Sequence, residues 1–341
     1  MHDFSWPDTL NTIISGTDLT RAQASAAMAE IMAGEASEAQ IAGLLIGLRT
    51  KQESAEEMAG LVDAMMGAAV TIPIPNSVDI VGTGGDGYGT FNISTTASFV
   101  AAGAGVRIAK HGNRAASSKT GSADLLEALG FGLELGPEHV AAMVEEAGFG
   151  FFFAPRFHPA MRFAVPVRRS LGVRTVFNFL GPLCNPASAL MSIGVSDPRM
   201  ARLMIDVLRA RGAGKGFVFF GEEGLDELSL AGPSRIYRLV GDEVTEAEFT
   251  PEDFGMDRVP IEAITGGGPD ENLAITRAVL EGERCPRRDV VLINAAPAIV
   301  LAGKADGFVD AVAVATESVD SGAAGAVLEH SLTMSKHLTE S

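Results

Sequence analysis

Cysteine and long apolar runs are both scarce in this chain. Its 341 residues include only Cys184 and Cys285, which have neither CxxC nor metal-ligand spacing, so we expect reduced, packed thiols and a cytoplasmic protein. The longest apolar run, at residues 290–301, is too short to cross a bilayer and contains Pro297. The first fifteen residues have no basic leader followed by an apolar segment. The sequence therefore predicts neither membrane insertion nor export.

Basic residues are also few. There are 26 Lys and Arg against 43 Asp and Glu, and the net charge is -17. A nonspecific nucleic-acid binder carries a basic stripe, so we expect no nucleic-acid partner. An acidic protein can still contain a local basic pocket, and its candidates are Lys110, Arg114, Lys119, Arg168 and Arg169.

Several catalytic motifs are missing. The chain contains no GxSxG, HExxH or SxxK, so no hydrolase nucleophile or zinc site of those kinds is predicted. It also lacks GxxxxGK[ST], which argues against a P-loop.

The pattern of apolar residues predicts two regions. Helical spacing at 19–32, 38–48 and 55–66 predicts three or four helices, and 47% hydrophobic content is enough for a large core. Pro73 and Pro75 then precede the first strand, at 78–81, where we place a hinge. Alternating strands and helices follow, with a hairpin at 236–249. The predicted fold is α/β: a small helical domain (1–72, with a contribution from about 168–190) and a larger domain (77–341) with a mostly parallel sheet.

A glycine-rich loop follows that first strand. Gly82, Gly84 and Gly87 match the GxGxxG spacing of dinucleotide-binding proteins. The acidic residue that such proteins place at the end of the next strand is absent, and Lys110 stands there instead. Glycines let backbone N–H groups approach an anion, and a helix starting near Ser94, capped by Asn92, adds its positive dipole. We therefore interpret the loop as a phosphate cradle, although a glycine-rich surface loop remains the plain alternative.

Polar side chains around this loop suit a sugar with phosphate at both ends. The candidate ligands are Lys110 and the hydroxyls of Ser94, Thr95, Ser117, Ser118 and Ser122. Asp226 and Glu227 follow a later strand, and ligands of open α/β sheets bind outside the carboxyl ends of strands. Two carboxylates beside phosphates can hold Mg²⁺, while a solvated acidic turn is the alternative.

Together these segments resemble the anthranilate phosphoribosyltransferases of tryptophan biosynthesis. The resemblance rests on GTGGDGYGTFNIST at 82–95 and AKHGNRAASSKTGSADLLEALG at 109–130. It continues through residues 157–187, GEEGLDELS at 221–229 and VLINAAPAIVLAGKADG at 291–307. It implies a nucleoside phosphorylase-like two-domain fold, a Mg²⁺-dependent pentosyltransferase, and a homodimer formed through the first helices.

The resemblance also implies which residues form the site. It assigns catalysis to Lys110, Asp226 and Glu227, and magnesium binding to Ser94, Asp226 and Glu227. It matches Asn113 and Arg168 to anthranilate binding, and a guanidinium can fork onto a carboxylate. The implied substrate contacts are Gly82, Gly85, Asp86, Thr90, Asn92, Ile93, Ser94, Thr95, Lys110, His111, Gly112, Asn113, Arg114, Ala115, Ala116, Ser117, Ser118, Ser122 and Arg168.

Three positions depart from the family pattern. KQES at 51–54 replaces the usual KGET, Phe163 stands where histidine is common, and Pro297 interrupts an alanine-rich helix. Because Phe163 lies beside the acceptor-binding segment, tolerance of substituted anthranilates is poorly defined by sequence. A pyrimidine nucleoside phosphorylase, which needs no metal, and a noncatalytic sugar-phosphate-binding protein remain the alternatives.

Overall fold

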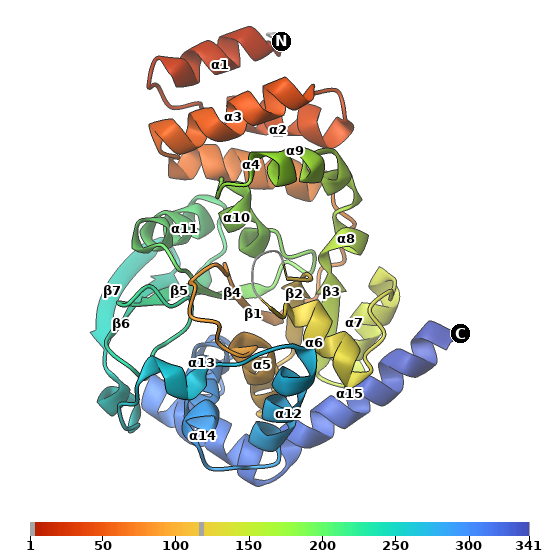
Figure 1. Ribbon diagram of the computed structural model, residues 1–341, viewed down its shortest axis with the longest axis vertical. Helices are drawn as coiled ribbons and strands as arrows, with labels where there is room; N and C mark the ends of the chain where they lie inside the picture. Colours follow the sequence, from red (N-terminus) through yellow and green to blue (C-terminus); the bar gives the residue numbers. More distant parts are fainter. Residues whose placement is uncertain (1–3, 116–118, 341) are drawn as a thin grey trace.

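The computed structural model describes residues 4–115 and 119–340. Four helices open the chain and lie together at one end of the molecule (Figure 1). Each of the second, third and fourth helices begins with a capping box, in which a hydroxyl and a side chain three residues later satisfy free N–H groups. Their bounds are α1 (Trp6–Ile14), α2 (Arg21–Ala33), α3 (Glu38–Lys51) and α4 (Ala55–Gly67).

A seven-stranded sheet occupies the middle of the molecule (Figure 1), in the order β3-β2-β1-β4-β5-β6-β7. The first five strands along the chain pair in parallel, and β6 and β7 add an antiparallel hairpin at one edge. The α/β prediction and the hairpin are both confirmed. The strands are β1 (Val78–Gly82), β2 (Ile108–Gly112), β3 (Phe149–Phe153), β4 (Leu190–Gly194), β5 (Lys215–Gly221), β6 (Ser234–Val240) and β7 (Glu243–Phe249).

Helices cover both faces of the sheet. The longer ones after β1 are α5 (Ile93–Gly103), α6 (Ser122–Leu129), α7 (Pro137–Glu146), α9 (Val165–Leu171), α11 (Pro198–Ala210), α12 (Pro269–Leu280), α13 (Pro286–Leu301), α14 (Phe308–Asp320) and α15 (Ala323–Glu340). Short turns α8 (Ala154–Phe157), η1 (Pro159–Phe163), α10 (Phe177–Leu180), η2 (Gly181–Leu183), η3 (Pro251–Phe254) and η4 (Ile261–Ile264) connect them. Among the described residues, no helix combines the length and apolarity that a membrane crossing requires.

Two hydrophobic cores form, one on each face of the sheet. Along β5, Phe217 and Phe219 enter the core shared with α5 and α13, because successive strand residues point to opposite faces. Val218 and Phe220 enter the other core, which also contains residues of α1–α4 and α9–α11. The opening helices therefore pack into the same core as one face of the sheet.

The expected interruption at Pro297 is wrong. Helix α13 runs from Pro286 to Leu301 with Pro297 inside it, and the residue is buried in the core. The residues around Pro297 are buried as well, so tertiary packing compensates for the N–H donor that proline lacks.

Candidate active site

The loop of residues 83–92 joins β1 to α5 and has a backbone that favours glycine. Left-handed φ values penalise side chains, so these positions restrict the residue type. The residues with positive φ are Gly84 (69°), Gly85 (79°), Gly87 (82°) and Gly89 (64°).

The acidic pair after β5 is joined to this loop. Asp226 Oδ2 accepts the N–H of Gly84 at 2.6 Å, and Glu227 Oε1 accepts the N–H of Ser94 at 3.1 Å. A Cβ on Gly82 would lie 2.4 Å from Asp226 Oδ2, so the end of β1 must stay free of a side chain. The structure thus brings together the two segments that the sequence placed at strand ends.

Burial disfavours the ionised form of these two carboxylates. Burial, followed by the charge of the neighbouring Asp86 carboxylate, raises the pKa of Asp226 to about 7. Burial also raises the pKa of Glu227 well above its usual range, with Asp226 as the second cause. Asp86 Oδ2 is buried without a hydrogen-bond partner in the described part of the chain. A divalent cation would relieve this crowding of negative charge.

The protein atoms do not make a complete metal cage. Within residues 4–115 and 119–340, no group of three or more His, Cys, Asp or Glu side chains could hold a metal ion. Mg²⁺ usually takes one or two carboxylates and completes its shell with substrate phosphates and water. The Asp226 and Glu227 pair fits that kind of site.

Lys110 lies deeper than the sequence suggested. It is 2% exposed, and its ammonium donates to the backbone carbonyl of Ile80 on the neighbouring strand. Burial lowers its pKa, while Asp79 and Glu227 favour its charged form. In this position the ammonium offsets part of the negative charge of Asp79 and Glu227, and its remaining N–H donors are available to other partners.

Asp79 and Asn185 complete a buried polar network that the sequence analysis missed. Asp79 accepts from the backbone N–H of His111 at 3.2 Å and from Asn185 Nδ2 at 2.8 Å. Burial raises the pKa of Asp79 to about 6. The sequence signal that could have predicted this network is Asp79 itself, an acidic residue inside the otherwise apolar strand β1.

The start of α5 differs from the expected cap. The helix begins at Ile93, and the side chain of Asn92 makes no capping hydrogen bond. Its amide instead donates to the carbonyl of Thr120 and accepts from Asn272 Nδ2 at 2.9 Å. The Asn92 side chain therefore bonds to residues distant in the sequence and does not cap the helix. The N–H of Ser94 is satisfied by Glu227.

The remaining predicted residues of the first loop have structural contacts. Thr90 forms an isolated antiparallel bridge with Thr265. Ile93 and Thr95 are buried on α5. Gly85 faces Arg174, since a Cβ there would lie 2.8 Å from Arg174 Nη1.

The loop after β2 is held by α6. Ser122 Oγ donates to the carbonyl of Asn113 at 3.3 Å and fills the space beside Gly112. The N–H of Ala115 donates to Asp124 Oδ2 at 2.9 Å. Ala116, Ser117 and Ser118, three of the predicted contacts, lie outside the described residues.

Arg114 points toward α6. Its guanidinium pairs with Asp124 and, through two nitrogens, with Glu127, and these bonds raise its pKa. The carboxylates on α6 outcompete the loop for this cation, so its predicted substrate contact would have to come from its backbone.

Arg168 on α9 and His111 on β2 are two further predicted contacts. The Arg168 guanidinium lies 5.1 Å from the Phe177 ring centroid, and its burial lowers its pKa. No carboxylate within the described ranges forms an ion pair with it. His111 Nε2 is buried without a hydrogen-bond partner, and burial lowers the pKa of His111 to about 3, so the ring is neutral. The site thus offers a cation for a carboxylate and no histidine base that titrates near pH 7.

Phe163, one of the departures from the family pattern, contacts the opening helices. A Cβ on Gly34, just after α2, would lie 2.7 Å from the Phe163 ring. The ring therefore packs against the opening helices, and the expectation that this residue bears on the acceptor has no contact to support it.

Arg174 was also missed by the sequence analysis. Its guanidinium donates to the carbonyls of Gly84 and Gly85 at 3.1 and 3.0 Å. It lies within the matched segment 157–187, but nothing in its local sequence distinguishes it from a surface arginine.

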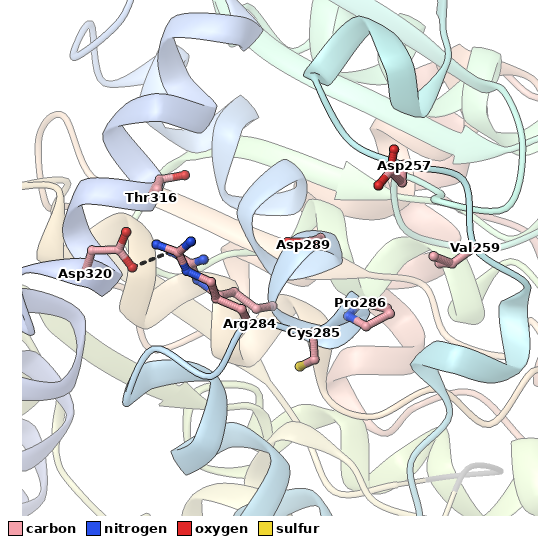
Figure 2. A pocket seen from close by; sticks show the side chains of 9 residues that line it. Asp257, Val259, Arg284, Cys285, Pro286, Asp289, Thr316 and Asp320 are labelled. Carbon is pink, nitrogen blue, oxygen red and sulfur yellow. Dashed lines mark hydrogen bonds and ion pairs between the residues drawn. The ribbon is translucent and has the colours of Figure 1, made fainter.

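A separate cavity of about 500 Å³ lies near the start of α13 and the end of α14 (Figure 2). Figure 2 shows Cys285, Asp289 and Asp320 among its lining side chains. None of the described residues predicted to bind substrate or metal lines it.

Comparison with known proteins gives a consistent result. Residues 74–325 match the family described as "Glycosyl transferase family, a/b domain", and residues 7–69 match its helical bundle domain. The anthranilate phosphoribosyltransferase of Moorella thermoacetica is 49% identical over 94% of this chain and 95% of its own. That of Herpetosiphon aurantiacus is 48% identical over 93% and 95%.

Solved structures agree. Anthranilate phosphoribosyltransferase from Thermus thermophilus has a TM-score of 0.91 at 46% identity, covering 96% of this chain and 99% of that one. The Saccharomyces cerevisiae enzyme in complex with PRPP and Mg has a TM-score of 0.90 at 28% identity, covering 98% and 100%. The chain belongs to the anthranilate phosphoribosyltransferase family.

Proposed function

We propose that this protein transfers the phosphoribosyl group of 5-phosphoribosyl 1-diphosphate to the amine of anthranilate, in tryptophan biosynthesis. The observation that carries the proposal is the junction of the glycine loop with the acidic pair, made by the Gly84–Asp226 and Ser94–Glu227 hydrogen bonds. Relatives close to half identical over nearly the whole chain carry this activity in their names. The yeast structure with PRPP and Mg supports Mg²⁺ as the cofactor.

The reaction needs charge stabilisation more than proton removal. The C–N bond forms at the anomeric carbon as the C–O bond to diphosphate breaks, and the amine then loses a proton. An arylamine is neutral and nucleophilic near pH 7, so no strong base is required. Bound Mg²⁺ would offset the negative charge that develops on the departing diphosphate.

The chain's own residues bind and orient the two substrates. We assign the metal to Asp226 and Glu227, with Ser94 at the start of α5 beside them. The glycine loop and the N-terminus of α5 supply backbone N–H groups for the diphosphate. Lys110 offsets part of the negative charge of Asp79 and Glu227, and we retain its direct phosphate contact as a prediction.

Arg168 is proposed to bind the anthranilate carboxylate. Its guanidinium is half-buried and has no ion pair in the described part of the chain, so a carboxylate would find a cation that is already partly desolvated. Asn113, in the loop after β2, is proposed to contact the same substrate.

Loss of anthranilate fluorescence tests the function. We expect it to require both phosphoribosyl diphosphate and Mg²⁺. Metal-independent phosphorolysis of a pyrimidine nucleoside would instead favour a nucleoside phosphorylase, and tight phosphoribosyl diphosphate binding without turnover would favour a noncatalytic binding protein.

Three further expectations stay predictions. A homodimer through the first helices is tested by sedimentation equilibrium, and a cytoplasmic location by fractionation of the source cells. The division into residues 1–72, with about 168–190, and 77–341 is tested by limited proteolysis, which should cut first near 73–76. We also keep the prediction that nucleic acid and membrane do not bind.

A further inference from the structure

We propose that Arg174 is a positioning residue of the phosphate loop, which fixes the loop amides for the diphosphate. This inference rests on the proposed function. Arg174 Nη1 donates to the carbonyl of Gly85 at 3.0 Å, and Nη2 donates to the carbonyl of Gly84 at 3.1 Å. Nη2 also donates to Ser196 Oγ at 3.1 Å, and Ser196 Oγ donates to the same Gly84 carbonyl at 2.9 Å.

The geometry of the peptide bond gives these contacts a consequence. In a trans peptide the C=O and the following N–H point in opposite directions. When Arg174 holds the carbonyls of Gly84 and Gly85, the N–H groups of Gly85 and Asp86 are turned away from the guanidinium. Two neighbouring amides turned the same way form the kind of concave site that binds an anion.

The Gly84 residue is held from both sides. Its N–H donates to Asp226 Oδ2 at 2.6 Å, and its carbonyl accepts from Arg174 and Ser196. Glycines at φ of 69° and 79° would otherwise sample many conformations, so the loop owes its single conformation to these partners.

Arg174 also packs against an aromatic ring. It follows Arg168 by six residues, and its guanidinium lies 5.2 Å from the Phe179 ring centroid. Its Nε is buried without a hydrogen-bond partner among the described residues, which leaves one donor beside the loop. Donating to two carbonyls at once requires the planar guanidinium of arginine, which lysine lacks.

Titration calorimetry with Mg²⁺ and inorganic diphosphate, together with steady-state kinetics, tests the proposal. Arg174→Ala should raise the diphosphate Kd and the KM for phosphoribosyl diphosphate roughly tenfold, the loss expected for a charge-assisted hydrogen bond. The KM for anthranilate should change much less. Hydrogen exchange of the amides of residues 84–86 should become faster.

Arg174→Lys distinguishes geometry from charge. It should remain impaired, because one ammonium cannot bridge two carbonyls and Ser196. Ser196→Ala should produce a smaller effect in the same direction, and it serves as the second test if Arg174→Ala fails to fold. Arg202→Ala, which breaks an exposed ion pair with Asp206 on α11, is the matched control and should behave as wild type.

Two results would overturn the proposal: full recovery in Arg174→Lys, or a loss of kcat in Arg174→Ala with an unchanged diphosphate Kd. Failure of the proposed function would look different. In that case the wild type would show no phosphoribosyl transfer, while diphosphate binding and amide exchange would still report on Arg174.

Discussion

Gly84 and Asp226 lie 142 residues apart in the chain, and a 2.6 Å hydrogen bond joins the backbone N–H of the first to the carboxylate of the second. The bond connects the loop after β1 with the loop after β5, two strands separated in the sheet only by β4. It places a carboxylate that can bind a metal directly at the loop that can bind phosphate.

Asp226→Asn should reduce kcat/KM by on the order of a hundredfold, because the amide keeps the shape but loses the charge that holds Mg²⁺. The fluorescence assay, run across a range of Mg²⁺ concentrations, measures the loss. Asp253→Asn is the control, since that carboxylate is exposed and caps the turn at Thr250. Equal rates in wild type and Asp226→Asn would remove Asp226 from the site.

The contribution of Asp226 to the stability of the metal-free protein should fall as the pH rises from about 4 to about 7. Its pKa is raised from 3.8 to about 7 by burial, so over this range the folded state holds a proton at Asp226 that the unfolded state has lost. The raised pKa of Asp79 acts in the same direction, whereas the lowered pKa of His111 acts in the opposite one. Each proton contributes a slope of at most about 1.4 kcal/mol per pH unit.

Urea denaturation at several pH values measures this slope. Over this range the free energy of unfolding of Asp226→Asn should fall less with rising pH than that of the wild type, and at pH 8 it should be higher than in wild type. Mg²⁺ with diphosphate should restore stability to the wild type at that pH. Equal pH dependence in wild type and Asp226→Asn would contradict the assignment.

Arg168→Ala should raise the KM for anthranilate by roughly tenfold or more, because it removes a partly desolvated partner for the substrate carboxylate. The KM for phosphoribosyl diphosphate should change little. Arg169→Ala is a matched control, because Arg169 is exposed one position away on the same helix. An equal increase in both Michaelis constants would argue against a carboxylate-binding role.

Gln52→Gly should stabilise the protein by about 1 kcal/mol. Gln52 ends α3 with φ 75° and ψ 127°, a conformation that glycine adopts without strain. Chemical denaturation measures the gain. Gln52→Ala keeps the strained backbone and should bring no stabilisation, so a gain in that variant would show that the side chain was responsible.

Gly82→Ala should impair activity by displacing Asp226, since the new Cβ would lie 2.4 Å from Asp226 Oδ2. Gly82 lies in a strand and does not have a positive φ, so backbone strain in the alanine variant would not contribute to the loss of activity. We expect an increase in the Mg²⁺ concentration needed for half-maximal rate, measured in the fluorescence assay. Gly67→Ala, where a Cβ meets nothing within 4 Å, should leave that concentration unchanged.

Local patterns predicted much of the fold. Apolar spacing and caps located the opening helices, and the run at 78–81 with the glycines after it located β1 and its loop. Patterns failed where a distant partner decides the outcome. Asparagine is a residue type typical of helix caps, yet the Asn92 side chain forms hydrogen bonds with Thr120 and Asn272 instead.

The candidate site shows the same division. The order of residues specifies which chemical groups are available: glycines that tolerate positive φ, two adjacent acids, and an arginine for a carboxylate. Folding then buries Lys110 against Ile80, directs Arg114 toward α6, and brings Arg174 to the glycine loop. The reason is physical. A residue's conformational range is local, whereas burial, ion pairing and hydrogen bonding depend on segments that the sheet brings together from distant parts of the chain.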